Sequence, residues 1–176
     1  MRLLKRVLLV FVLLLGLLLL GGLAMPSKFR VVREVQIGAS ADKVYALIAS
    51  PRQWAGWSVW HQRDPAMMID YSGPESGVGA SWAWRSQSEG DGRMRFTAAE
   101  PGRRLGYELF FPDFGTSSQG EFVLEPTAGG TRVVWRMDGD MGRNPLYHWM
   151  ALFADRMVGQ DFEAGLNGLK RLAEKP

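Results

Sequence analysis

The chain has 176 residues, a formal net charge of +3 at pH 7 and a sequence pI of about 9.4, and its length suits one domain with a short appendage. Three residues near the N-terminus, Arg2, Lys5 and Arg6, account for the whole positive excess, so the remainder is neutral. Without a net basic field the globular part is not expected to bind nucleic acid, and the absence of cysteine excludes disulfides and a cysteine-linked lipid anchor.

The first predicted element is a membrane-spanning helix. Residues 7–25 form a run of 19 residues without charge, within the roughly 17–25 that span a bilayer and beyond the roughly 7–15 of a signal-peptide core. Because the run is apolar on every side, it suits lipid better than a buried core position. We expect an anchor over residues 1–27 and a globular domain over residues 28–176, with cleavage near Gly22–Ala24 as the alternative.

Basic residues flank the predicted span on both sides in similar number. Those closest to it, with the terminal amine, favour a cytoplasmic N-terminus. We therefore expect a single-pass inner-membrane protein with its domain on the extracytoplasmic side. A secreted or periplasmic domain after signal cleavage is the alternative.

The globular part begins with a predicted strand and helix. Residues 29–37 alternate apolar and polar side chains as a strand does. Ser40 is placed to cap a helix that Pro51 ends. From Met67 to about residue 137, six short alternating runs separated by turn-forming residues predict an antiparallel meander. Asn144 and Pro145 then begin a helix that reaches about Ala173.

These elements predict an α+β fold. The strands have one apolar and one charged phase, so the sheet has one solvated face. The last helix carries an apolar stripe at three- and four-residue steps, and that stripe must cover the apolar face of the sheet. We expect a curved antiparallel β-sheet of about seven strands wrapped around a long C-terminal α-helix.

The sequence resembles the SRPBCC superfamily, the START and polyketide-cyclase-like domains with the helix-grip fold. The resemblance spans residues 29–174 and is closest to a bacterial membrane-anchored branch. It is carried by VQIGASADKVYALIASPRQWAGWSVW, YSGPESGVGASWAW and the segment from GGTRVVWRM to the final helix. The resemblance implies a deep cavity between sheet and helix that holds lipids, sterols, polyketides or similar molecules.

Aromatic and methionine side chains dominate the predicted inner face, where compact cores favour leucine, isoleucine and valine. Such residues can line a cavity as well as fill it. Gly165 and Gly168 either let the last helix approach the sheet or leave room at the cavity mouth. After the first helix, Trp54 is expected to pack against other side chains, whereas Trp57 and Trp60 are expected to contact the ligand. The predicted ligand-binding residues are Trp57, Trp60, Trp82, Trp84, Met94, Phe96, Tyr107, Leu109, Phe122, Trp135, Met137, Trp149, Phe153 and Met157.

Catalytic groups are scarce in the sequence. Ser58, His61 and Asp64 could share one helical turn, but spacing alone does not make a triad, and we interpret His61 as an exposed, passive rim residue. His148 is interpreted as a surface or cap residue. No carboxylate falls on the inner phase of the central strands, which favours binding over catalysis. We expect no catalytic residue, no metal and no cofactor.

The leading functional hypothesis is a membrane-tethered, non-enzymatic carrier or sensor of a hydrophobic small molecule such as a lipid or polyketide. One alternative is a cyclase- or hydrolase-type enzyme that uses Tyr107, His148 or Arg33 in the same cavity. The other is an adaptor whose cavity is filled by its own side chains. The ligand and the oligomeric state stay open.

Overall fold

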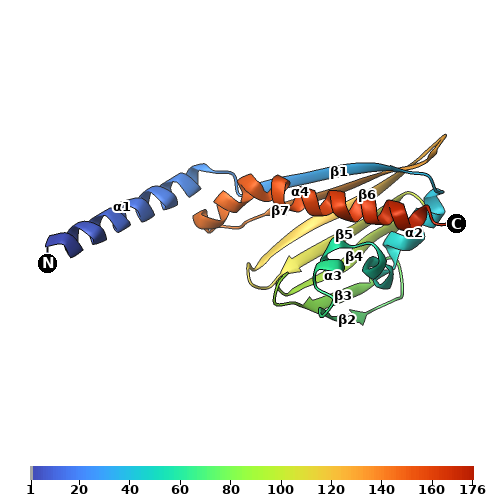
Figure 1. Ribbon diagram of the computed structural model, residues 1–176, viewed down its shortest axis with the longest axis horizontal. Helices are drawn as coiled ribbons and strands as arrows, with labels where there is room; N and C mark the ends of the chain where they lie inside the picture. Colours follow the sequence, from blue (N-terminus) through green and yellow to red (C-terminus); the bar gives the residue numbers. More distant parts are fainter. Residues whose placement is uncertain (1) are drawn as a thin grey trace.

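The computed structural model describes residues 2–176 and contains one seven-stranded antiparallel sheet curved around a long helix (Figure 1). The strand order is β1-β7-β6-β5-β4-β3-β2, so every neighbour except β1–β7 is a sequential hairpin partner. The elements are α1 (Arg2–Ala24), β1 (Lys28–Ile37), α2 (Ala41–Ala49), the 3-10 helix η1 (Pro51–Gly56), α3 (Val59–Arg63), β2 (Met68–Ser72), β3 (Ser81–Arg85), β4 (Gly92–Glu100), β5 (Arg104–Phe111), β6 (Thr116–Thr127), β7 (Gly130–Asp140) and α4 (Pro145–Ala173).

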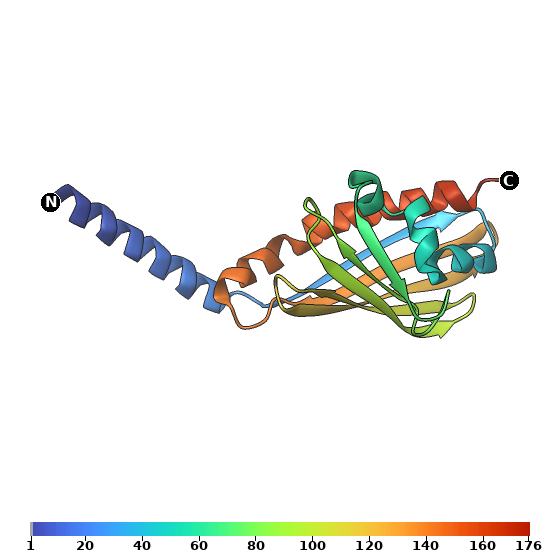
Figure 2. The same cartoon turned by 90° about the horizontal axis from the view of Figure 1, so that it is seen from below.

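The helix boundaries follow local signals in the sequence. The Ser40 hydroxyl accepts a hydrogen bond from the Lys43 amide at 3.3 Å, which caps α2. The Asn144 side chain accepts one from the Leu146 amide at 3.0 Å and caps α4, with Pro145 in its first turn. The helix-grip architecture predicted from the sequence is therefore confirmed, and Figure 2 shows α4 lying across the sheet.

The apolar and polar residues that alternate along the strands lie on opposite faces of the sheet. On β4, Met94 and Phe96 are buried, and the intervening residues face solvent. On the outer face, Glu121 forms ion pairs with Arg104, at 2.7 Å, and with Arg136. These arginines are about half exposed, so each pair contributes at most about 1 kcal/mol. The apolar inner face provides the main driving force.

The C-terminal half of α4 closes the aromatic core. The Phe162 ring stacks on Trp135 with centroids 3.8 Å apart and planes 8° apart. A Cβ atom on Gly168 would lie 2.4 Å from the carbonyl oxygen of Trp57. Of the two roles expected for the helix glycines, close approach to neighbouring backbone is thus the one Gly168 serves. The core here is filled by side chains.

The N-terminal half of α4 is different. Its small residues Ala151 and Ala154 are buried. Phe153 and Met157 lie on the other side of the helix, 56% and 64% exposed. The expectation that these two side chains face inward is wrong. The helix can bury only one side against the sheet, and its alanine side allows the closer contact.

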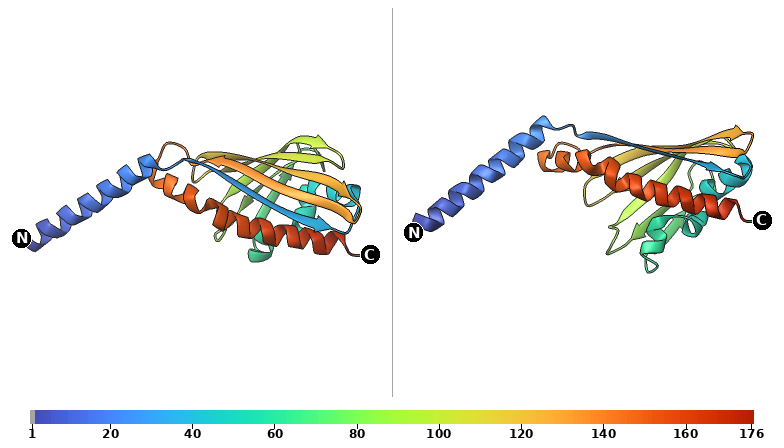
Figure 3. Two further views of the ribbon diagram at one scale, coloured as in Figure 1. Left: turned by 90° about the horizontal axis from the view of Figure 1, so that it is seen from above. Right: turned by 45° about the horizontal axis from the view of Figure 1, so that its top comes forward.

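The helix α1 extends away from the domain and meets the start of α4 (Figure 3). The Trp149 indole donates a hydrogen bond to the carbonyl oxygen of Leu18 at 3.0 Å. The His148 Nδ1 atom lies 2.8 Å from the carbonyl oxygen of Gly22. Residues Leu3–Ala24 are long and apolar enough to cross a membrane and are almost wholly exposed, a test that a signal sequence passes equally.

Candidate ligand pocket

Three tryptophans fix the segment between α2 and β2, and each indole nitrogen has a different partner. Trp54 donates to the Ile48 carbonyl at 2.9 Å, and Trp57 donates to the Leu47 carbonyl at 3.2 Å. Trp60 donates to the Asp161 carboxylate on α4 at 3.1 Å. The tryptophans therefore tie η1 and α3 to two helices, and they do not form a flat platform.

This segment covers an apolar pocket above β3, β4 and β5. The cavity measures about 80 Å³, about half of an engineered cavity of about 150 Å³ that binds benzene. Four tryptophans and two methionines supply most of its wall. The lining residues are Trp54, Ser58, Trp60, His61, Met67, Trp82, Trp84, Glu89, Met94, Leu109 and Phe111.

Three lining residues are polar. The hydroxyl oxygen of Ser58 and both ring nitrogens of His61 are buried, and no described residue forms a hydrogen bond with them. Burial lowers the pKa of His61 below its usual 6.5, because an apolar surrounding disfavours the charged imidazolium. The Glu89 carboxylate is engaged by Arg63, whose Nε lies 3.4 Å away.

The Ser58, His61 and Asp64 arrangement is not a catalytic triad. Asp64 accepts hydrogen bonds from the Ser86 hydroxyl at 2.6 Å and from the Ala66 amide at 3.0 Å, and its carboxylate is thereby occupied away from His61. The interpretation of His61 as an exposed rim residue is also wrong, since its ring nitrogens are buried in the pocket wall.

The predicted ligand-binding residues fall into three places. Five of them line the pocket, namely Trp60, Trp82, Trp84, Met94 and Leu109. Six belong to the packed core, namely Trp57, Phe96, Tyr107, Phe122, Trp135 and Met137. The remaining three lie on the N-terminal half of α4, where Trp149 contacts α1 and Phe153 and Met157 are exposed.

Other pocket residues do not follow from the sequence pattern. The spacing of the tryptophans predicts packing for Trp54, and nothing in the sequence singles out Met67, Glu89 or Phe111. Met67, Glu89 and Phe111 lie next to a strand end or in a turn, where alternation does not predict which face of the sheet a side chain occupies. The spacing of Ser58 and His61 is visible in the sequence, but their burial depends on elements distant in the chain.

The polar groups expected to serve an enzyme do not meet in this pocket. The Tyr107 hydroxyl accepts a hydrogen bond from the Trp135 indole at 2.8 Å, and complete burial raises its pKa. Arg33 pairs with Asp155 at 2.8 Å and with Glu163 at 2.5 Å. His148 lies at the junction with α1. Each of these groups has a structural role where it stands.

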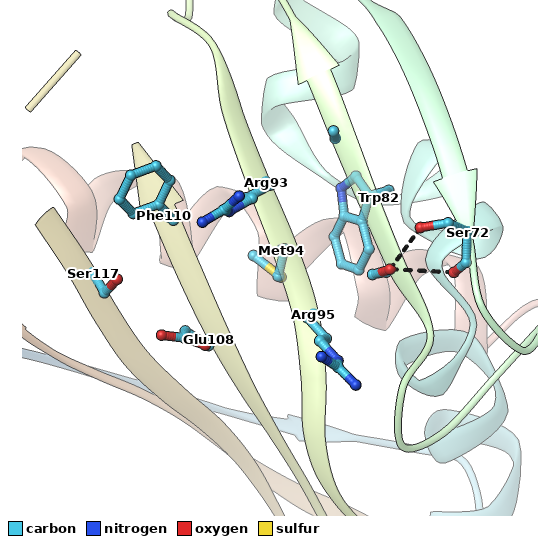
Figure 4. Close-up of a pocket in the computed structure, with 10 residues that line it drawn as sticks. Ser72, Trp82, Arg93, Met94, Arg95, Glu108, Phe110 and Ser117 are labelled. Atoms are coloured by element: carbon cyan, nitrogen blue, oxygen red, sulfur yellow. Dashed lines mark hydrogen bonds between the residues drawn. The ribbon is translucent and has the colours of Figure 1, made fainter. Parts of the chain in front are cut away.

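A larger hollow of about 420 Å³ lies on the charged face of the sheet (Figure 4). Arg93 stacks over the Phe110 ring with its guanidinium carbon 4.4 Å from the centroid. Arg95 and Glu108 also line the hollow. A hydrogen bond of 2.8 Å joins the Ser72 and Ser81 hydroxyls at one side. This polar hollow differs from the interior pocket, which is mostly apolar.

Comparison with known proteins agrees with this architecture. Residues 28–174 match the family model described as polyketide cyclase / dehydrase and lipid transport. No match is found among the curated proteins. A protein from Chromobacterium violaceum has a similar fold, with a TM-score of 0.61 and 17% identity, over 86% of this chain and 100% of its own.

Two further solved structures share the fold. The di-domain ARO/CYC protein StfQ from the steffimycin biosynthetic pathway gives a TM-score of 0.63 at 14% identity, covering 84% of this chain and 51% of StfQ. The Aha1 dimer from Colwellia psychrerythraea gives 0.54 at 20% identity, covering 82% of this chain and 96% of that protein. These likenesses concern the fold alone, whereas the family model matches nearly the whole domain. The chain therefore belongs to the polyketide cyclase / dehydrase and lipid transport family.

Proposed function

We propose that this protein is a membrane-tethered carrier or sensor that binds a hydrophobic small molecule, such as a lipid or polyketide, in the pocket beneath α3. The observation that carries the proposal is the wall of this pocket, where tryptophan and methionine side chains from both sides of the domain surround a cavity. The family description, which names cyclases and lipid transport, supports a domain of the hydrophobic-ligand-binding or cyclase type.

The size of the cavity limits what fits without rearrangement. At about 80 Å³ it is below the roughly 300–1,000 Å³ of most ligand sites, so a long ligand must displace part of the wall. Met67 and Met94 suit this role because unbranched thioether side chains repack readily. The pocket therefore holds one end of a ligand directly and accommodates more only when these residues move.

A chain of aromatic contacts leads from the pocket towards the anchor. The Trp84 and Phe111 rings are 6.0 Å apart, Phe111 and Phe114 are 6.4 Å apart, and Phe114 lies 5.8 Å from Tyr147 at the start of α4. These contacts connect the pocket wall, through aromatic side chains, to the end of the domain at which α1 is attached.

The membrane tether is supported by α1 and by the surface beside it. The first turns of α4 form hydrogen bonds to α1, and the same half of α4 exposes Leu146, Met150 and Phe153. A bilayer around α1 would be the natural surrounding for these side chains. A tethered domain would meet apolar ligands where they are concentrated.

A cyclase-type enzyme is the second candidate. It is favoured by the unpaired imidazole of His61, since a neutral imidazole in an apolar site can accept a proton from a substrate. Against this candidate, the His61 ring has no carboxylate in the described part of the chain to orient it, because Asp64 accepts hydrogen bonds from the Ala66 amide and the Ser86 hydroxyl.

Two adjacent methionines allow a direct test of binding. Met67 lines the pocket and Met68 is 59% exposed, so Met67→Trp should fill the cavity and Met68→Trp should not. Full-length protein would be purified in a mild non-ionic detergent and analysed by native mass spectrometry for bound apolar compounds. We expect them on the wild type and on Met68→Trp, and a loss on Met67→Trp. If none of the three proteins carries a ligand or is stabilised thermally by an added lipid, the proposal is wrong.

A further inference from the structure

Ser58 and His61 stand out among the polar side chains of the domain. Ser58 is fully buried and occupies the N-cap position of α3, yet its hydroxyl forms no cap hydrogen bond. Ser40, in the same position of α2, does form one. Both nitrogens of His61 are likewise buried without a partner among the described residues. Three positions apart at α3, these residues line the same pocket.

A buried polar atom without a partner is costly. Leaving one unsatisfied destabilises a protein by about 1–3 kcal/mol, which is why nearly all such atoms in native proteins are paired. A serine at an N-cap has an easy partner in the backbone amides of its own helix. The Ser58 hydroxyl is not used in this way, and it and His61 belong instead to the wall of a cavity.

We propose that Ser58 and His61 form the polar recognition point of the pocket and bind a neutral ketone, aldehyde or alcohol group of an otherwise apolar ligand. This inference rests on the proposed function and deepens it by naming the chemistry of the ligand. A serine hydroxyl and a neutral imidazole each offer one donor and at least one acceptor. Together they match a carbonyl or hydroxyl oxygen.

The charges around the pocket argue against an ionic ligand. The Glu89 carboxylate lines the same cavity and would repel a ligand carboxylate. The arginine that pairs with Glu89 is Arg63, whose guanidinium is engaged by Glu89 at 3.4 Å and by Asp161 at 2.8 Å. Burial keeps the His61 ring neutral, as the lowered pKa indicates. A neutral polar group avoids the large desolvation penalty that a charge would meet among tryptophans.

The size of the cavity agrees with a small polar end group. The cavity of about 80 Å³ is about half of the roughly 150 Å³ cavity that holds benzene, so it admits a carbonyl and a few carbons. The rest of the ligand would then run past Met67 and Met94. A ligand of this class has a slender apolar body and one terminal oxygen function.

The test uses a matched pair of probes on the full-length protein in detergent. The first probe is 2-heptanone, and the second is 2-methyl-1-heptene, in which a methylene group replaces the ketone oxygen. Heptanoate serves as the anionic probe. Binding is measured by ligand-observed NMR titration, and the ring nitrogens of His61 are followed by long-range nitrogen–proton correlation. Partition of one probe into detergent is the same for all variants, so it cancels when variants are compared. Comparisons between probes use free concentrations, corrected for the partition of each probe into protein-free detergent.

For the wild type we expect 2-heptanone to bind more tightly than the alkene, and heptanoate to bind weakest. Ser58→Ala and His61→Phe should each weaken ketone binding by roughly threefold to tenfold, the worth of one neutral hydrogen bond. Neither variant should weaken alkene binding. Ser40→Ala, remote from the pocket, should leave both affinities unchanged, and near-ultraviolet circular dichroism checks that every variant is folded.

The outcomes separate the two proposals. If the ketone and the alkene bind wild type and Ser58→Ala equally, the pocket binds apolar ligands and the polar recognition point is wrong. It is also wrong if the His61 nitrogen shifts do not respond to the ketone, because the polar atoms would then be satisfied by water alone. If neither neutral probe binds any variant and Met67→Trp also changes nothing, the proposed function itself fails.

Discussion

Replacing Ser58 with alanine should stabilise the ligand-free protein, whereas the same change at Ser40 should destabilise it. Both serines occupy N-cap positions. The Ser40 hydroxyl accepts a hydrogen bond from the Lys43 amide at 3.3 Å. The Ser58 hydroxyl is fully buried and has no partner among the described residues. The two substitutions remove the same atom from equivalent helix positions, so the difference between them isolates the satisfaction of that atom.

The magnitudes follow from these environments. An unsatisfied buried hydroxyl destabilises a protein by about 1–3 kcal/mol. Removing it at Ser58 should therefore raise the free energy of unfolding by about 1 kcal/mol or more, after a small loss of packing. Loss of a serine N-cap lowers the free energy of unfolding by about 0.5–2 kcal/mol, which is the expectation for Ser40→Ala. For a domain of this size, 1 kcal/mol corresponds to about 2–4 °C in melting temperature.

Both variants would be unfolded with urea as full-length protein in detergent, with tryptophan fluorescence as the signal. Pocket tryptophans report on the domain, while α1 contains no tryptophan. Parallel slopes of the transitions would allow the midpoints to be compared directly. If the urea midpoint of Ser58→Ala is lowered, as that of Ser40→Ala is expected to be, the reasoning is refuted. That result would mean that a bound water or a rotated hydroxyl already satisfies the Ser58 oxygen.

Three further predictions concern the contacts described above. Burial lowers the pKa of His61, so the unfolded chain binds a proton at this residue more readily than the folded protein does. The contribution of neutral His61 to the free energy of unfolding is therefore complete above about pH 6.5 and is lost as the pH falls further. Between about pH 8 and about pH 5.5, urea unfolding should show a smaller decrease in this free energy for His61→Phe than for the wild type. Gly168→Ala would place a Cβ atom 2.4 Å from the Trp57 carbonyl oxygen, and the overpacking of about 1–3 kcal/mol should exceed the helix-propensity gain of about 1 kcal/mol; unchanged or raised stability would contradict the close approach. Trp149→Phe removes the hydrogen bond to the Leu18 carbonyl and should speed amide hydrogen exchange in the first turns of α4 while the urea midpoint of the domain stays the same.

The sheet and its gripping helix could be predicted because their signals are periodic. Alternation placed Met94, Phe96 and Trp135 on the buried face, and each of them is buried. The side of α4 that faces the sheet was harder to predict than the faces of the strands. Phe153 and Met157 have the size and spacing of core residues, but the helix turns its small residues towards the sheet because these allow a closer contact. A helix that is apolar on two sides does not reveal from sequence which side is covered.

The pocket was less predictable than the fold. The spacing favoured ligand contact for Trp57 and packing for Trp54, yet Trp54 lines the cavity and Trp57 is buried in the core. Trp57 lies in the turn between η1 and α3, and this turn breaks the helical spacing that would join Trp54 to Trp60, so a single continuous helix does not predict which way these side chains face. The burial of Ser58 depends on strands far away in the chain, so its unpaired hydroxyl became visible only in three dimensions.

The filled core and the pocket of the domain adjoin each other. Trp135 stacks on Phe162 and donates to the Tyr107 hydroxyl, and this filled core leaves no room for ligand. The pocket residue Trp60 contacts the same stack, with its ring 6.0 Å from Trp135 and 6.5 Å from Phe162. Its indole is also fastened to α4 through Asp161, which accepts a hydrogen bond from Trp60 at 3.1 Å and forms an ion pair with Arg63 at 2.8 Å. The core can thus supply the stability that offsets unsatisfied polar atoms in the pocket, and a ligand that satisfies those atoms would gain affinity from the relief.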